Sequence, residues 1–161
     1  MRRHLAGLAA LAMAALPLQA DAATDPIGDL IQTVQGAASA ALEEAPRWLL
    51  KATLYHTGGG VGTRDSMGCR VSPMRTLAVD PRIVPKGTVV YIKETVGLPL
   101  PGGGVHDGLW YASDTGGGIK GSRIDLFTGW GAASMRVLRE LNQQRLSVTP
   151  VSTFEGCPPL S

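Results

Sequence analysis

From Leu49 onward the chain is a series of short apolar runs separated by glycine and proline, and this pattern constrains the fold more than any other feature. The runs are rich in Val, Ile, Tyr and Thr, which favour β-strands. We expect six strands, at residues 49–56, 75–80, 88–94, 109–114, 122–127 and 146–151. A single helix is expected over 132–144. Six short strands with one helix favour a small, mostly β barrel over an α/β layered fold.

Two segments of this region resemble each other. "RTLAVDPRIVPKGTVVYI" and "GLWYASDTGGGIKGSRIDLF" both read as an apolar strand, an aspartate, five residues, Lys-Gly and a second strand. Sliding one along the other places Asp80 on Asp114 and Lys86 on Lys120. Duplicated strand–loop–strand units are one way to close a barrel without an unpaired edge. The alternative is a chance similarity between two hairpins.

The N-terminal part of the chain has a different character. Residues 1–22 combine two arginines, an apolar run, a proline and a small-x-small site ending at Ala22, which predicts a secretion signal. The apolar run is too short for the roughly 20 residues that span a bilayer, so no transmembrane segment is expected. Residues 23–46 carry apolar side chains at helical spacing and predict an amphipathic helix, either docked or a stalk. Residues 47–161 then form one domain.

Charge and cysteines limit the partners and the compartment. Without residues 1–22 the chain has 13 basic and 12 acidic residues, which is too balanced for a nucleic-acid backbone as a partner. Cys69 and Cys157 are the two cysteines of a chain expected to be exported, and an oxidising compartment favours a disulfide between them. Two unpaired thiols are the alternative. Neither cysteine has the neighbours of a metal site.

The glycines at 116–121 satisfy the G-x-G-x-x-G nucleotide fingerprint. That fingerprint requires a helix that begins at the glycines and points its N-terminus at a pyrophosphate. Here the glycines run into "SRIDLF", which alternates as a strand. The order Lys120 then Gly121 also departs from the P-loop, in which glycine precedes lysine. Nucleotide binding is therefore not expected.

The same alternation predicts where the side chains point. Ile124 and Leu126 are expected to face the core, so Arg123, Asp125 and Phe127 face the outer surface or a cleft. An aromatic ring, a guanidinium and a carboxyl group suit a sugar. If the glycine loop folds back, Asp114 shares the cleft, and repulsion between the two acids raises one pKa. The alternative is that Asp114 caps loop amides while Asp125 is a solvated strand residue.

"DTGGGIKGSRIDLFTG" and "RTLAVDPRIVPKGTVVYI" together resemble the three-aspartate (3D) domain of the membrane-bound lytic transglycosylase A family, over roughly 49–130. The resemblance implies a six-stranded double-psi β-barrel. It places the three aspartates at Asp80, Asp114 and Asp125. By the family pattern Asp125 is the catalytic acid/base and Asp114 its supporting partner. Asp80, at the end of the duplicated strand, is expected to be structural.

The resemblance also implies a reaction. Lytic transglycosylases cleave the bond between N-acetylmuramic acid and N-acetylglucosamine in peptidoglycan, using the 6-hydroxyl of the sugar in place of water and no cofactor. An intramolecular attack of this kind has a high effective molarity, so one aspartate suffices. The implied partners are glycan strands and other cell-wall enzymes. The implied location is the periplasm, at the cell wall or outer membrane. Residues expected to support the acids or bind substrate are Tyr55, Gly117, Gly118, Lys120 and Arg123.

Full-length members of that family have a second β domain that forms the opposite wall of the glycan groove. We expect this chain to have no room for one, which leaves the irregular segments 55–69 and 96–108 to build a wall. Besides Tyr55, their polar residues are expected to be loop polars or sugar contacts rather than zinc ligands: His56, Arg64, Asp65, His106 and Asp107. Two alternatives to the transglycosylase stay open. One is a non-catalytic barrel that binds glycan or positions an enzyme, and the other is a glycoside hydrolase.

Overall fold

The computed structural model describes residues 46–58 and 62–160. They form six strands, β1 (Trp48–Thr57), β2 (Thr76–Val79), β3 (Thr88–Ile92), β4 (Leu109–Asp114), β5 (Arg123–Trp130) and β6 (Arg145–Thr153). All six predicted strands are confirmed, β4 with the predicted bounds and the others with shifted ends. The predicted secretion signal lies outside the described residues, as does the amphipathic helix apart from its last position.

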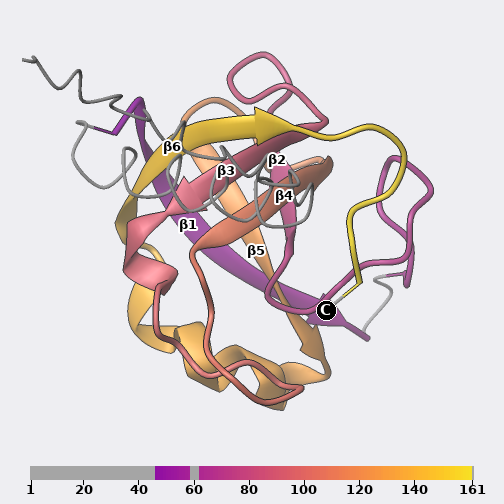
Figure 1. The fold of residues 1–161 in the computed structure, drawn as a ribbon, viewed down its shortest axis with the longest axis vertical. Helices are drawn as coiled ribbons and strands as arrows, with labels where there is room; N and C mark the ends of the chain where they lie inside the picture. Colours follow the sequence, from indigo (N-terminus) through magenta and orange to yellow (C-terminus); the bar gives the residue numbers. More distant parts are fainter. Residues whose placement is uncertain (1–45, 59–61, 161) are drawn as a thin grey trace, which may run out of the picture.

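The six strands close into a barrel in the order β1-β5-β2-β4-β3-β6, with β6 also paired to β1 (Figure 1). The two similar segments correspond to β2–β3 and β4–β5. The first strands of the two units, β2 and β4, pair with each other in parallel. Each second strand pairs antiparallel with the first strand of the other unit, β5 with β2 and β3 with β4. The two units therefore interlock symmetrically, as duplicated units would. The double-psi connection remains a prediction.

Two 3-10 helices complete the described elements, η1 (Lys93–Thr95) and η2 (Ala132–Leu141). The predicted strand 88–94 ends at Ile92 because η1 follows it directly. The late helix is confirmed in a shorter form. It ends because Asn142 is extended and Gln143 has a φ of 67°, in the left-handed region that stops a helix. No helix among the described residues is long and apolar enough to cross a membrane.

The barrel interior is filled by side chains from every strand. Those that are fully buried include Leu50, Leu77, Val90, Trp110, Leu126 and Val148. Ile124 and Leu126 are both buried in this core, as their alternation predicts. The strands that hold the acids are thus fixed by packing on one face, so the acids are carried on a rigid scaffold.

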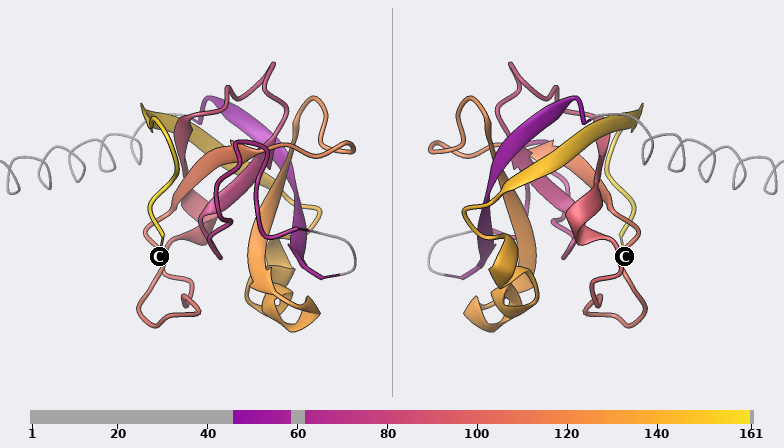
Figure 2. Two further views of the ribbon diagram at one scale, coloured as in Figure 1. Left: turned by 90° about the vertical axis from the view of Figure 1, so that its right-hand side faces the viewer. Right: turned by 90° about the vertical axis from the view of Figure 1, so that its left-hand side faces the viewer.

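A disulfide joins Cys69 to Cys157, as predicted, with the two Cα atoms 5.4 Å apart. It ties the segment that follows β6 to the loop between β1 and β2. Figure 2 shows the glycine loop 115–121 at one end of the barrel, while η2 and the loop 97–107 lie at the opposite end. The two ends are therefore distinct surfaces.

Candidate active site

Asp114 and Asp125 come together because both lie across from one small residue. Ala78 of β2 is paired with Asp125 of β5 on one side and with Asp114 of β4 on the other. The acids are two strand spacings apart, roughly 10 Å between backbones. An alanine between them leaves the space above β2 to the two carboxyl groups. Ala78 was not recognised from the sequence as part of the site.

Asp114 is held by three donors. Its Oδ2 accepts a hydrogen bond from the Tyr55 hydroxyl at 2.9 Å. Its Oδ1 accepts the backbone N–H of Ser66 at 2.9 Å and that of Thr115 at 2.8 Å. The Ser66 hydroxyl also donates to the carbonyl of Ser113 at 3.2 Å. Asp114 thus has a fixed orientation. The contribution of Ser66 comes from its backbone, which leaves no signal in the sequence.

Asp125 is half-buried, and its Oδ1 is buried without a hydrogen-bond partner. Burial raises the pKa of Asp125, Thr53 lowers it, the negative charge of Asp114 raises it further, and Arg123 lowers it. The net direction is upward. Because the neutral form tolerates burial better than the anion, Asp125 keeps its proton to a higher pH than an exposed aspartate does. This is the property required of a general acid.

Tyr55 is bonded to Asp114 and is influenced by the charge of Asp125. Burial first, and then the charge and hydrogen bond of Asp114 and the charges of Asp125 and Asp65, raise the pKa of Tyr55 far above its ordinary value. The phenol therefore stays protonated and acts as a donor. Of these three carboxylates, Asp114 is the one that Tyr55 contacts directly. Asp65 is itself buried, and its Oδ1 accepts the backbone N–H groups of Met67 and Cys69 at 3.0 and 2.8 Å. The structure thus brings Tyr55 next to Asp114, as a supporting residue would be.

Asp80 has different surroundings. It is buried and bonded to the Arg82 guanidinium at 2.6 and 3.0 Å, and its Oδ2 accepts the backbone N–H of Gly121 at 2.7 Å. The hydrogen bond from Arg82, followed by that from Gly121, lowers the pKa of Asp80. A permanently ionised, paired carboxylate does not donate protons. Its geometry is that of a clamp that holds the glycine loop of the second unit.

The glycine loop itself is largely exposed. Gly117, Gly118 and Lys120 are exposed, and a Cβ added at either glycine meets no atom within 4 Å. The Arg123 guanidinium donates to the carbonyl of Gly118 at 3.3 Å and lowers the pKa of Asp125 by its charge. Within the described residues, Lys120 makes no hydrogen bond or ion pair to either Asp114 or Asp125. The structure places Arg123 near the acids and leaves Lys120 on the surface.

The prediction that Phe127 faces the outer surface or a cleft is wrong. Phe127 is fully buried because it packs between Tyr55 and Trp130, with ring centroids at 5.1 and 5.8 Å. It cannot stack on a sugar. Trp130, which the sequence did not single out, is 49% exposed and is the accessible aromatic residue at the end of β5.

His106 is a polar residue of the loop 97–107, as expected, but the expectation that it could contact a sugar is wrong. It is buried and stacked on Trp110, with its Nε2 2.6 Å from the Met74 carbonyl. Its Nδ1 accepts the N–H of Gly108 at 2.8 Å, which makes Nε2 the protonated nitrogen. Burial lowers the pKa of His106, so the ring is neutral. Asp107 pairs with Arg75. Among the residues that are described, no group of three His, Cys, Asp or Glu side chains is arranged to hold a metal ion.

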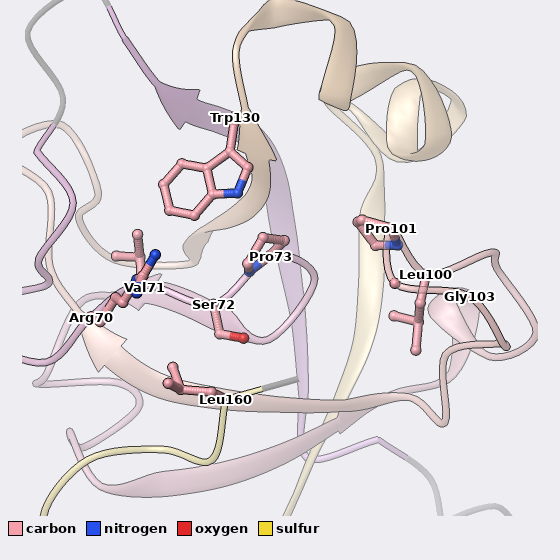
Figure 3. A pocket seen from close by; sticks show the side chains of 10 residues that line it. Arg70, Val71, Ser72, Pro73, Leu100, Pro101, Gly103, Trp130 and Leu160 are labelled. Carbon is pink, nitrogen blue, oxygen red and sulfur yellow. The ribbon is translucent and has the colours of Figure 1, made fainter.

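A groove of about 760 Å³ lies beside Trp130, at the end of β5 (Figure 3). Trp130 stands on one side of it and Leu160 on the other, and the segment 70–73 runs between them. Leu100, Pro101 and Gly103 of the loop 97–107 line its far end. Neither Asp114 nor Asp125 lines this groove. A crevice that passes the Asp125 carboxyl directly remains a prediction.

Comparison with known proteins agrees with the sequence resemblance. Residues 75–140 match the family model of the 3D domain. This range contains Asp80, Asp114 and Asp125. No curated protein matches the chain.

Several solved structures are similar to the barrel. The lytic transglycosylase MltA of E. coli with bound chitohexaose is 21% identical, with 59% of this chain and 29% of that chain covered and a TM-score of 0.43. LtgG, a lytic transglycosylase of Burkholderia pseudomallei, is 28% identical, with 60% and 29% covered and a TM-score of 0.40. The membrane-bound lytic murein transglycosylase of Agrobacterium tumefaciens is 29% identical, with 52% and 23% covered and a TM-score of 0.37. The chain therefore spans less than a third of the length of each.

Proposed function

We propose that this chain, whose residues 75–140 match the family model of the 3D domain, cleaves the glycosidic bond between N-acetylmuramic acid and N-acetylglucosamine without water. The observation that carries the proposal is the state of Asp125. Its carboxyl is half-buried, one oxygen accepts no hydrogen bond, and burial together with Asp114 raises its pKa. A carboxylic acid that keeps its proton is the group that such a reaction needs first.

In the proposed mechanism Asp125 acts twice. It first donates its proton to the bridging oxygen, so the bond from that oxygen to the anomeric carbon breaks and the leaving sugar departs as an alcohol. The Asp125 carboxylate then takes the proton of the 6-hydroxyl, whose oxygen closes the anhydro ring on the same anomeric carbon. Because the nucleophile belongs to the substrate, no second carboxylate has to activate water.

The remaining residues act on this acid. Asp114, fixed by Tyr55, Ser66 and Thr115, places a negative charge where positive charge develops on the sugar ring. The same charge favours the protonated form of Asp125 before the reaction. Arg123 opposes this effect, which keeps the acid strong enough to release its proton. Neither role requires a cofactor.

We further propose that the protein acts outside the cytoplasm, on peptidoglycan. The support is the sequence of residues 1–22, which has the pattern of a secretion signal, and the Cys69–Cys157 disulfide, which is typical of an oxidising compartment. Association with other cell-wall enzymes is part of this proposal.

A second candidate function is a non-catalytic barrel that binds glycan. The observation in its favour is that the groove of about 760 Å³ is lined by neither acid. A hydrolase is the remaining alternative and would need a second carboxylate to act on water.

Incubation of the purified protein with sacculi in ¹⁸O-water, followed by mass spectrometry, separates these functions. The proposal predicts anhydro ends without ¹⁸O, and their loss in Asp125→Asn. The matched control Asp107→Asn makes the same change at an aspartate on the loop 97–107 and is expected to retain the products. Reducing ends that contain ¹⁸O would indicate hydrolysis instead. Sedimentation with sacculi and no products would support the binding module.

A further inference from the structure

We propose that the groove at Trp130 is a binding subsite for a pyranose ring that carries a carboxylate, at a distance from the bond that is cleaved. The inference rests on the proposed function, because it extends the site along the glycan. It assigns a role to Trp130 and Arg70, which the mechanism does not use.

The first argument is the face on which Trp130 lies. Along β1, Thr53, Tyr55 and Thr57 share one face, and their register partners on β5 are Asp125, Phe127 and Trp130. Simple alternation would put residues 125 and 130 on opposite faces. The register shift after Tyr55 inserts one extra residue in β5 and turns Trp130 to the face of Asp125.

The position of Trp130 also fits a remote subsite. Its register partner Thr57 lies four positions along β1 from Thr53, the partner of Asp125, which is roughly 13 Å at about 3.3 Å per residue. The buried ring of Phe127 fills the interval and contacts Trp130. A ligand that reaches both residues must therefore be an extended chain rather than a single small molecule.

The second argument is the chemistry of the lining. Trp130 is 49% exposed, and its indole faces the groove, where Val71, Pro73 and Pro101 offer apolar surface (Figure 3). An exposed aromatic face attracts the C–H groups of a sugar ring. The volume of about 760 Å³ lies within the roughly 300–1,000 Å³ of typical ligand sites.

The third argument is charge. Arg70 lines the groove, and its guanidinium makes no hydrogen bond or ion pair within residues 46–58 and 62–160. Arg136 lines the adjoining depression, which shares Pro73, Pro101 and Trp130 with the groove. None of the described lining residues of either space is acidic. Two guanidiniums without a carboxylate partner favour an anionic group, and arginine binds carboxylates in a bidentate manner.

The test is calorimetric binding to the full-length protein with Asp125→Asn, which prevents turnover. The two probes are a soluble glycan of alternating N-acetylglucosamine and N-acetylmuramic acid, which carries carboxylates, and chitohexaose, which carries none. Trp130→Ala should weaken both about tenfold, while Trp130→Phe retains a ring and most of the affinity. Arg70→Gln should weaken only the carboxylated glycan, by about fivefold.

The controls are Lys86→Gln and Val105→Ala, which remove an exposed charge and an exposed apolar side chain outside the groove. Both should bind as the parent does. Unchanged binding in Trp130→Ala and Arg70→Gln, an equal loss of both probes in Arg70→Gln, or no binding of either probe would overturn the subsite.

The proposed function is tested separately by cleavage of sacculi with Asp125 intact. If cleavage occurs but the groove variants bind normally, the subsite fails alone. If the groove variants lose binding but no cleavage occurs, the subsite stands and the catalytic proposal fails.

Discussion

The disulfide gives the prediction whose size follows most directly from the structure. Cys69 and Cys157 are 88 residues apart in sequence, so the bond closes a long loop in the unfolded chain. In the chain-entropy model a loop of this length contributes about 4.6 kcal/mol. The free energy of unfolding of a native protein is about 5–15 kcal/mol in total. The double variant Cys69→Ser/Cys157→Ser should therefore lose about 30% or more of its stability.

Removal of the disulfide should also affect the candidate active site. The backbone N–H of Cys69 bonds to Asp65, and the same loop presents the N–H of Ser66 to Asp114. Releasing the disulfide loosens this loop, so glycan cleavage should fall even under conditions in which the variant remains folded.

Urea unfolding followed by circular dichroism measures the effect. We expect the free energy of unfolding to fall by about 3–5 kcal/mol in the double variant. Wild-type protein reduced with dithiothreitol should match it, since the same bond is absent. A fall below about 1 kcal/mol would refute the reasoning, because the disulfide would then not restrict the unfolded chain.

Three further predictions concern single residues. Asp125→Asn should lower cleavage by at least about a hundredfold, and it should raise the free energy of unfolding at pH 7, because it removes a half-buried group whose ionisation is disfavoured in the folded state. The raised pKa of Asp125 means that its ionisation is less favourable in the folded than in the unfolded protein. The stability difference between Asp125→Asn and the wild type should therefore vanish as the pH falls below about 4, where Asp125 is protonated in both the folded and the unfolded state. A stability difference that does not change with pH would contradict this. Tyr55→Phe should lower the free energy of unfolding in urea by about 1.5 kcal/mol and reduce cleavage, because Asp114 loses a hydrogen-bond donor. A variant as stable as the wild type would contradict a stabilising role of this hydrogen bond. Since the pKa of His106 is lowered in the folded protein, the stability of the wild type should fall as the pH drops below about 6.5. The variant His106→Gln should be less stable than the wild type at pH 8, and its stability should fall less in acid. An identical loss of stability in acid for both proteins would mean that a group other than His106 causes it.

The strands were predictable because each is a short run of β-branched and aromatic residues bounded by turn residues, and this local pattern survives in the fold. The symmetric pairing of the two units follows from their similarity in sequence. The disulfide was predictable from the two cysteines and the expected export of the chain. These features depend on residue type and spacing, which a sequence contains.

The site was only partly predictable. Asp114 and Asp125 could be named from the resemblance, but their common neighbour Ala78 depends on strand order. The face of Trp130 depends on a register shift that residue alternation does not reveal, and Phe127 is buried because the rings of Tyr55 and Trp130 pack against it. The Ser66 donor is a backbone group from a distant loop. The burial of His106 was not predictable because its bonds to Met74 and Gly108 exist only in the folded chain.

The central claim is that Asp125 keeps a proton that it can transfer to the glycosidic oxygen. A ¹³C NMR titration of the aspartate carboxyl carbons measures this directly, with the Asp125 signal assigned by its loss in Asp125→Asn. The account predicts a midpoint above the value of about 3.9 for an exposed aspartate, and a lower midpoint in Asp114→Asn. A midpoint at or below about 3.9 in the wild-type protein would contradict it.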